Sequence, residues 1–161
     1  MNFVFDHLLP GEAVWDLCCD HGLIGLRAYQ SGQFPQVHLV DQVPLIIQNL
    51  ERKFLKDFHR TEANQKAFFW IKEGGQIEVV DGTVIIAGVG AHAILKILRS
   101  LSQKKGLRAL RLILGPQRDE AFFEHELATW LEFKNNFKLQ LKSEILEGTR
   151  VRRIFIFDII N

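Results

Sequence analysis

The chain has 161 residues, of which 47% are hydrophobic and 24% are charged, and its formal net charge is +1. This length indicates one domain, residues 1–161, with a core of its own, and the composition excludes a disordered chain. A net charge this close to zero gives no general attraction to nucleic acid, although a local basic patch would suffice to bind RNA. Only two cysteines are present, which excludes a disulfide-stabilised fold.

The N-terminal segment gives no indication of a secretory signal, because Asp6 and Glu12 interrupt it and no long apolar run is present. No apolar stretch reaches the length of about 20 residues that a membrane span needs. Cys18 and Cys19 are adjacent, and neighbours in a strand point to opposite faces, so we expect no bridge between them. We therefore expect a cytoplasmic protein without membrane association. The spacing of cysteine and histidine predicts no metal site.

Short apolar runs alternate with helical patterns in the first half of the chain. The predicted elements there are a strand over 13–18, a helix over 23–30, a strand over 37–41, a helix that begins at Pro44, and a strand over 68–71. In the Pro44 helix the apolar residues Ile46, Leu50, Phe54 and Phe58 recur at a spacing of four, which places them on one face.

The second half continues the alternation and then changes. Its predicted elements are a strand over 83–87, a helix over 91–101, a strand over 110–114, a helix over 120–133, and strands over 137–145 and 152–160. Alternating strands and helices indicate a parallel sheet with helices on both faces. The connection 147–150 is too short for a parallel crossover, so the last two strands are expected to form an antiparallel hairpin.

The ends of the strands are where open α/β sheets bind ligands. Residues 16–25 follow the first strand, and Gly22 and Gly25 there could let a ligand lie close to the backbone. The following helix offers its N-terminal amides to a carboxylate. Taken alone, this glycine-bearing loop would equally serve a dinucleotide or no ligand.

Two further strand ends add to this prediction. Asp41 ends the second strand about 20 residues beyond the loop, where an acidic side chain can accept hydrogen bonds from ribose hydroxyls. Alternatively, Asp41 only caps the helix that follows it. Gly88 and Gly90 follow the fourth strand and would open space for a ligand, or they form a tight packing turn.

These residues resemble the bacterial tRNA (adenine(22)-N1)-methyltransferases, which are class I S-adenosylmethionine-dependent enzymes. Residues 16–21 (Asp-Leu-Cys-Cys-Asp-His) resemble the family's Asp-x-Gly-x-Asp-His loop. Residues 86–91 resemble its Ile-Ala-Gly-Met-Gly-Gly stretch, residues 112–117 its Leu-Ile-Leu-Gln-Pro-Asn stretch, and residues 144–147 also resemble the family. The order and spacing agree along nearly the whole chain.

This sequence departs from the family at several motif positions. Cys18 and Ala91 replace glycines, and Gly115 and Gln117 replace a glutamine and an asparagine near the expected acceptor pocket. The family also has a C-terminal helical extension thought to help hold tRNA. The sequence ends at Asn161, directly after the last predicted strand, so the resemblance covers the cofactor-binding domain and does not include that extension.

The resemblance implies a Rossmann-like class I methyltransferase fold, with a mostly parallel seven-stranded sheet that ends in the antiparallel hairpin. It implies S-adenosyl-L-methionine as cofactor and tRNA or another RNA as partner. It implies cofactor-binding roles for Asp16, Cys18, Asp20, His21, Gly22, Gly25, Asp41, Gln42, Glu73, Gly88, Val89 and Gly90. Asp20 and His21 are the candidate catalytic residues, and His92, Gln117 and Arg118 are the candidate substrate contacts.

Several alternatives stay open at this point. Asp20 could stabilise a cationic product, or it could only cap the following helix. The protein could methylate adenine N1 in tRNA, could methylate another RNA, a protein or a small molecule, or could be a non-catalytic binding module. Trp15 and Trp70 are most simply core residues. Two basic clusters are candidate RNA contacts or merely solvated faces: Lys104, Lys105, Arg108 and Arg111, and then Arg150, Arg152 and Arg153.

Overall fold

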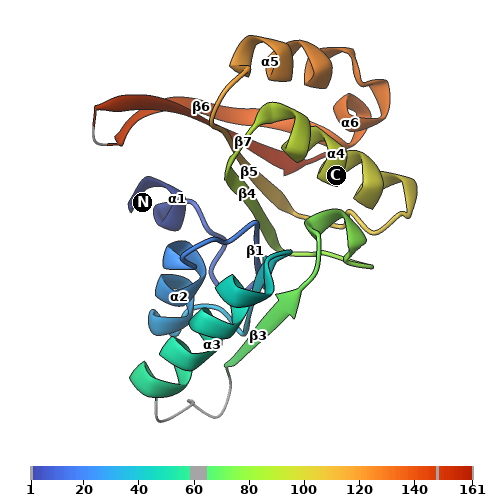
Figure 1. Ribbon diagram of the computed structural model, residues 1–161. Coiled ribbons are helices and arrows are strands. Elements are labelled where there is room, and N and C mark those ends of the chain that lie inside the picture. The colour runs from blue at the N-terminus through green and yellow to red at the C-terminus, as the bar shows by residue number, and fades with distance from the viewer. Residues whose placement is uncertain (1, 59–64, 148, 161) are drawn as a thin grey trace.

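The computed structural model describes residues 2–58, 65–147 and 149–160, and Figure 1 shows their arrangement around one central sheet. The sheet has seven strands in the order β3-β2-β1-β4-β5-β7-β6. The strands are β1 (Val14–Leu17), β2 (Gln36–Asp41), β3 (Lys66–Ile71), β4 (Thr83–Val89), β5 (Arg111–Pro116), β6 (Phe137–Glu147) and β7 (Arg150–Ile159). β1 to β5 are parallel, and β7 lies antiparallel to both of its neighbours. The predicted fold class, including the C-terminal hairpin, is confirmed; Gly148 in its connection lies outside the described residues.

Helices cover both faces of the sheet, with α1 to α3 on one side and α4 to α6 on the other (Figure 1). They are α1 (Asn2–Asp6), α2 (Leu23–Gln30), α3 (Pro44–Asp57), α4 (Ala91–Gln103), α5 (Glu120–Thr129) and α6 (Leu131–Asn136), and a 3-10 turn, η1 (Gly74–Gln76), precedes β4. Pro44 opens α3 as predicted. α1 and η1 are not anticipated by the sequence, because both are too short to show a helical period. No helix in the described part of the chain is long and apolar enough to cross a membrane.

The core consists of two layers, because successive residues of each buried strand point to opposite faces. In β4, Val84 and Ile86 contact the layer under α4 to α6, whereas Ile85 contacts the layer under α1 to α3. In β5, Leu112 and Ile113 divide in the same way. These strands read as continuous apolar runs because both of their faces are buried.

The predicted helix over 120–133 is wrong in one respect, since it is two helices. The backbone at Trp130 is extended (φ −76°, ψ 96°) and separates α5 from α6. The break leaves Leu131 68% exposed and buries Phe133. The Phe133 ring then packs against Phe137 and Phe157 at centroid distances of 5.2 and 5.1 Å.

A partly buried ion pair fixes the N-terminal segment and the reversed strand to the sheet. Arg111 of β5 donates from Nε and Nη2 to the two carboxylate oxygens of Asp158 on β7, at 2.6 and 2.8 Å. Its Nη1 donates to the carbonyl of His7 at 3.1 Å. A bidentate guanidinium–carboxylate pair is directional as well as attractive, so it aligns β7 on β5. The bond to His7 also ties the segment after α1 to the amino end of β5.

Close packing of α2 on β2 depends on glycine at the start of the helix. Gly22 precedes α2 with φ +62°, and a Cβ there would lie 2.7 Å from Leu39 Cδ2 and 2.8 Å from Leu50 Cδ2. A Cβ at Gly25 would lie 3.0 Å from Leu39 Cγ. The two glycines therefore let the helix approach the sheet.

Gly22→Ala should lower the free energy of unfolding by about 3 kcal/mol, because it adds a clash to the cost of a left-handed backbone. The matched control is Gly32→Ala, where φ is +70° but nothing lies within 4 Å of the added Cβ. That variant should lose only about 1 kcal/mol. Urea unfolding of both variants measures the difference, and equal losses would contradict the packing role of Gly22.

Candidate functional site

The loop after β1 is held in an unusual backbone conformation. Cys18 and Asp20 have φ of 64° and 47°, in the left-handed region that side chains other than glycine rarely adopt. The Cys19 N–H donates to the Val40 carbonyl at 3.0 Å, and the Asp20 N–H donates to Asp41 Oδ2 at 3.3 Å. Strain of this kind persists where surrounding contacts fix it, and such positions concentrate at functional sites.

Asp16 is a buried carboxyl group beneath this loop. Its Oδ2 accepts a hydrogen bond from the Gly25 N–H at 3.1 Å, which links the end of β1 to the first turn of α2. Burial, together with the charge of Asp41, raises the pKa of Asp16 from 3.8 to about 7, although the Gly25 hydrogen bond opposes the rise. Asp16 can therefore change its charge near neutral pH.

Asp41 connects the ends of β1 and β2. In addition to the bond from Asp20, its Oδ1 accepts from the Val43 N–H at 2.9 Å. Each carboxylate oxygen retains capacity for a second donor. Val43 is the residue directly before α3, and no side chain caps the first turn of this helix. The capping role considered for Asp41 is therefore not found, and its carboxylate remains able to accept from a ligand as well.

Two cavities meet at the loop. The first, of about 230 Å³, lies between the loop and the ends of β4, β5 and β7, and the second, of about 470 Å³, lies toward β2, β3 and α4. Both are lined by Cys18, Asp20 and Gly88. Gly88 has φ +80°, and only the Gln117 side-chain nitrogen, at 3.6 Å, lies near the position of its absent Cβ. The two cavities therefore form one bent cleft, of the size that small ligands occupy.

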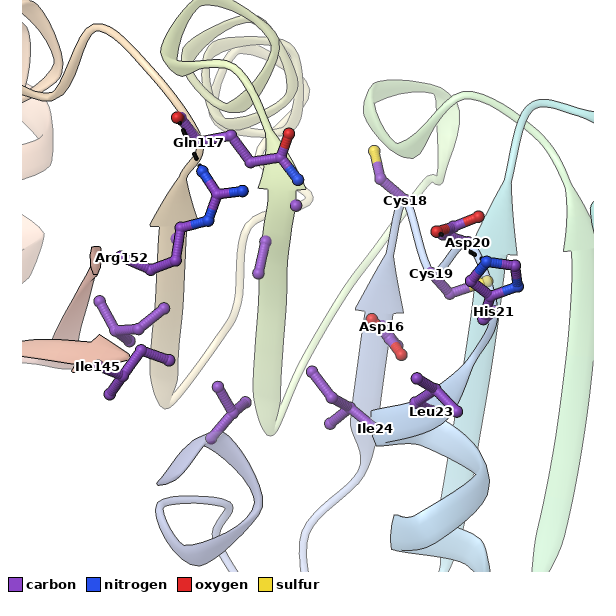
Figure 2. Close-up of a pocket in the computed structure, with 15 residues that line it drawn as sticks. Asp16, Cys18, Cys19, Asp20, His21, Leu23, Ile24, Gln117, Ile145 and Arg152 are labelled. Atoms are coloured by element: carbon purple, nitrogen blue, oxygen red, sulfur yellow. Dashed lines mark hydrogen bonds and ion pairs between the residues drawn. The ribbon is translucent and has the colours of Figure 1, made fainter. Parts of the chain in front are cut away.

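Figure 2 shows the two walls of the first cavity. Asp16, Cys18, Asp20 and His21 come from the β1 side, whereas Gln117, Arg152 and Ile145 face them from across the cavity. Arg152 Nη1 donates to the Gln117 carbonyl at 3.0 Å, which joins the hairpin to the loop after β5. His21 is 82% exposed, with Nε2 3.7 Å from Asp20 Oδ2. The burial of Cys18 raises its pKa to about 11, so its thiol stays neutral.

The second cavity combines acidic and apolar side chains. Asp41, Gln42 and Glu73, which the resemblance assigns to the cofactor, line it, and Val89 closes it on the β4 side. Glu73 Oε1 is bound by Lys96 Nζ at 2.6 Å. Its apolar lining includes Val43, Ile46 and Ile97. This arrangement suits a ligand with hydroxyl groups at one end and a flat apolar ring at the other.

Some expected site residues lie elsewhere. Gly22 and Gly25 line neither cavity, because they face Leu39. Gly90 begins α4 beneath Arg118, whose Nε would lie 3.1 Å from a Cβ there, and neither residue lines the cleft. The His92 ring packs on Phe122 at 4.5 Å in a separate hollow on α4.

The basic clusters are largely engaged within the protein. Lys104 Nζ donates to the carbonyl of Ile77 at 3.1 Å and also to that of Gly75, and Arg111 is bound to Asp158. Arg153 lies 2.8 Å from Glu120 and 2.9 Å from Glu144. Lys105, Arg108 and Arg150 are exposed, so each cluster keeps only part of the basic surface that the sequence alone allowed. Among the described residues no group of three His, Cys, Asp or Glu could hold a metal ion.

Sequence reasoning missed the residues that close the cleft. Val4 of α1, with Ile145 and Ile154 of the hairpin, contributes apolar wall to the first cavity, and Lys72 lines the second. Arg152 was counted only as part of a basic cluster. If the two strands of the predicted hairpin are paired from their short connection, Ile145 lies opposite Arg152, as it does in the structure. The sequence gives no comparable signal for α1.

Comparison with known proteins agrees with this geometry. A methyltransferase-domain family matches residues 1–155. The chain belongs to this methyltransferase family. The strand order and the position of the cleft at the carboxyl ends of the parallel strands are therefore those of its class, and the suspected relationship is confirmed at this level. No curated protein matches the sequence.

Solved structures share the fold at low sequence identity. M. capricolum TrmK, in complex with S-adenosyl-homocysteine, superposes with a TM-score of 0.77 at 18% identity, over 98% of this chain and 66% of that one. Streptococcus pneumoniae Sp1610 with S-adenosyl-L-methionine gives 0.74 at 20%, over 98% and 71%. The B. subtilis M1A22 tRNA methyltransferase TrmK gives 0.71 at 16%, over 98% and 64%. This chain spans about two thirds of the length of these proteins.

The raised pKa of Asp16 predicts a pH-dependent stability. The folded-state pKa of about 7 lies above the ordinary 3.8, so the contribution of Asp16 is fully present below about pH 4 and is lost as the pH rises through 7. Between about pH 5 and pH 8 this loss should amount to about 2–3 kcal/mol. Asp16→Asn cannot ionise and should lack this component. Urea unfolding at the two pH values measures it, and an equal pH response in wild type and variant would refute the assignment.

Proposed function

We propose that this protein is an S-adenosyl-L-methionine-dependent methyltransferase that methylates N1 of an adenine in tRNA, in the cytoplasm. The observation that carries the proposal is the bent cleft, whose halves meet at Cys18, Asp20 and Gly88. One half suits a nucleoside and the other leaves room for an acceptor. The B. subtilis protein with this fold, described as an M1A22 tRNA methyltransferase, supports the choice of acceptor.

The residues present fit the cofactor. In the second cavity, Asp41 would accept from the ribose hydroxyls, while Val43, Ile46 and Ile97 would enclose the adenine ring. In the first cavity, Asp16 and Asp20 would face the ammonium group of the methionine portion, and the amides at the start of α2 would face its carboxylate. A positively charged ligand would also favour the ionised form of Asp16.

The acceptor would occupy the rest of the first cavity. Ile145 and Ile154 provide an apolar wall, and the Gln117 side chain lies beside Gly88, where the two cavities meet. A flat base with polar edges suits such a mixture of apolar surface and hydrogen-bonding groups. An adenine within tRNA would have to be turned out of its stack to reach this pocket.

S-adenosylmethionine supplies a methyl group that is already activated by its positively charged sulfur. The protein then mainly has to position the reactants. Adenine N1 carries no proton before attack, so its lone pair forms the new bond without a general base. The methylated base becomes a cation, and the Asp20 carboxylate at the junction would stabilise that charge. His21, beside Asp20 and exposed, would orient the loop or contact the cofactor.

The first test is calorimetric titration with S-adenosylmethionine. Wild type should bind with micromolar affinity, and Asp41→Ala should bind at least about 10-fold more weakly, because it lacks the charged acceptor for the ribose. Asp41→Asn keeps one side-chain oxygen that can accept from the Val43 N–H, so the loop should stay ordered. Weaker binding by this variant would therefore reflect loss of the charged contact with the ligand, not loss of loop order. Asp57→Ala, at the exposed end of α3, is the control. A folded wild type that does not bind would refute the cofactor assignment.

Transfer of a tritiated methyl group to unmodified tRNA then tests the acceptor. Methylation at N1 removes a pairing position, so reverse transcription should stop at the modified adenine. Incorporation without such a stop would move the acceptor to another atom. Cofactor binding without any incorporation would favour a protein or small-molecule substrate.

Cys18 is expected to limit cofactor affinity, because its side chain occupies the junction in a left-handed backbone conformation. Cys18→Gly should bind S-adenosylmethionine several-fold more tightly in the same titration, since glycine adopts this conformation without strain. Cys18→Val should bind more weakly, because a β-branched side chain is strained there. Weaker binding by the glycine variant would show instead that the thiol contributes a favourable contact.

A further inference from the structure

Three rings form a continuous stack across β1, β2 and β3. Trp15, His38 and Phe68 lie opposite one another in the strand register. The rings of Trp15 and His38 are 3.6 Å apart and inclined by 3°, and those of His38 and Phe68 are 4.6 Å apart and inclined by 9°. The ring planes are therefore roughly perpendicular to the sheet, and each ring faces its neighbour along the direction from β1 to β3.

Hydrogen bonds lock this stack in place. Trp15 Nε1 donates to Asp81 Oδ1 at 3.0 Å, and Trp70 Nε1 donates to His38 Nδ1 at 3.1 Å. His38 Nδ1 is thus an acceptor, which requires a neutral ring with its proton on Nε2, 3.3 Å from Gln36 Oε1. Burial lowers the pKa of His38 to about 4, in agreement with this assignment. The stack is rigid and uncharged at neutral pH.

The stack ends on a ring face that points past the edge of the sheet. β3 is an edge strand, and Phe68 stacks on His38 from the β3 side, so its other face is directed away from β2. Among the described residues, His38 is the only ring stacked on Phe68. Phe68 and Trp70 are only half-buried. α3 packs on the opposite face of β3, where Phe54 meets Phe69 at 5.3 Å.

Lysines flank these rings along the same face of β3. Lys66, Phe68 and Trp70 alternate with Ala67, Phe69 and Ile71, so the three share one face of the strand, and Lys72 directly follows β3. Both lysines are exposed, and Lys72 Nζ lies 5.6 Å from the centroid of the Trp70 ring. Lys72 also lines the second cavity, so this face is continuous with the cleft.

We propose that this edge of β3, formed by Lys66, Phe68, Trp70 and Lys72, binds a single-stranded segment of RNA. A base extends the ring stack on the outer face of Phe68, and the lysines contact the flanking phosphates. Stacking on aromatic rings within a basic groove is how proteins bind single strands without reading their sequence. The proposal rests on the RNA substrate of the proposed function and gives it a second contact outside the cleft.

The charge of the face favours RNA over a protein partner. Each aromatic side chain of β3 is flanked by a lysine, and the Asp81 carboxylate lies at the other end of the stack, where it is bound to Trp15. The exposed apolar surface consists of two half-buried rings, which is small compared with the core of a stable protein interface. A rigid ring also loses little conformational entropy when a base stacks on it, so even a small surface can contribute.

The test is fluorescence anisotropy of a labelled single-stranded oligoadenylate of about 12 nucleotides, a length within the range that single-strand sites cover. Phe68→Leu should weaken binding about 10-fold, because leucine keeps apolar volume and removes the stacking face. Lys66→Gln should lower the slope of log K against log salt by about 0.7, the value for one phosphate contact on a single strand. The matched control is Ile71→Ala, exposed on the opposite face of the same strand.

Wild-type affinity and salt slope in both Phe68→Leu and Lys66→Gln would overturn the proposal, as would an equal loss in Ile71→Ala. Circular dichroism checks that Phe68→Leu is folded, and Lys66→Gln provides a second test that does not alter the core. Phe68 and Lys66 line neither cavity, so both variants should bind S-adenosylmethionine like wild type. Failure of the RNA site with intact cofactor binding therefore leaves the proposed function standing, whereas absent cofactor binding in wild type refutes that function by itself.

Discussion

Close packing between α2 and the sheet is the constraint on which the site depends. Leu39 of β2 fills the space that a Cβ at Gly22 or Gly25 would need, so the helix can begin only a few residues after β1 ends. The chain must turn sharply in between, and Cys18 and Asp20 take left-handed conformations to do so. Because that turn is fixed from behind by packing, its front face can present Cys18 and Asp20 to both cavities at once. The strain in the loop is thus compensated by burial on the side away from the ligand.

The acidic side chains around this turn hold the backbone and, in the proposed function, would also face the cofactor. Asp16 and Asp41 each accept a hydrogen bond from the backbone of the loop or of the helix that follows it. Such bonds set the positions of the carboxylates, but two buried or half-buried negative charges close together are unfavourable without a cation. A ligand that carries both a sulfonium and an ammonium group would relieve this repulsion. The same charges that raise the pKa of Asp16 would then contribute to the affinity for such a ligand.

Much of the fold was predictable because the central strands are buried on both faces and therefore appear as uninterrupted apolar runs. β3 begins at Lys66, two residues before the predicted strand, because one face of an edge strand is partly solvated and its first residue is polar. The site is a different matter. The acidic loop and Asp41 follow from the strand ends, whereas Val4, Ile145 and Ile154 reach the cavity only through tertiary placement of α1 and the hairpin. Gly22 and Gly25 were predicted to bind the cofactor, but they line neither cavity and instead allow close helix packing, which no local pattern distinguishes from close approach to a ligand.

The distribution of positive charge limits how this protein can hold a polyanion. With a net charge of +1, attraction to RNA must come from local groups. Arg111 and Arg153 are paired with carboxylates. Lys104, at the end of α4, donates to the backbone carbonyls of Gly75 and Ile77. Those cations stabilise the fold and would be costly to redirect, since each would leave a partner unsatisfied. In the proposed function, RNA binding would then rely on the cations that stay exposed, Lys66 and Lys72 among them, together with stacking and shape. A rigid ring face at the sheet edge and a turned-out base in the cleft are both contacts of that kind, and both act on single-stranded or unpaired nucleotides. Methylation at adenine N1 would impose the same restriction, because this atom is accessible only when the base is not paired.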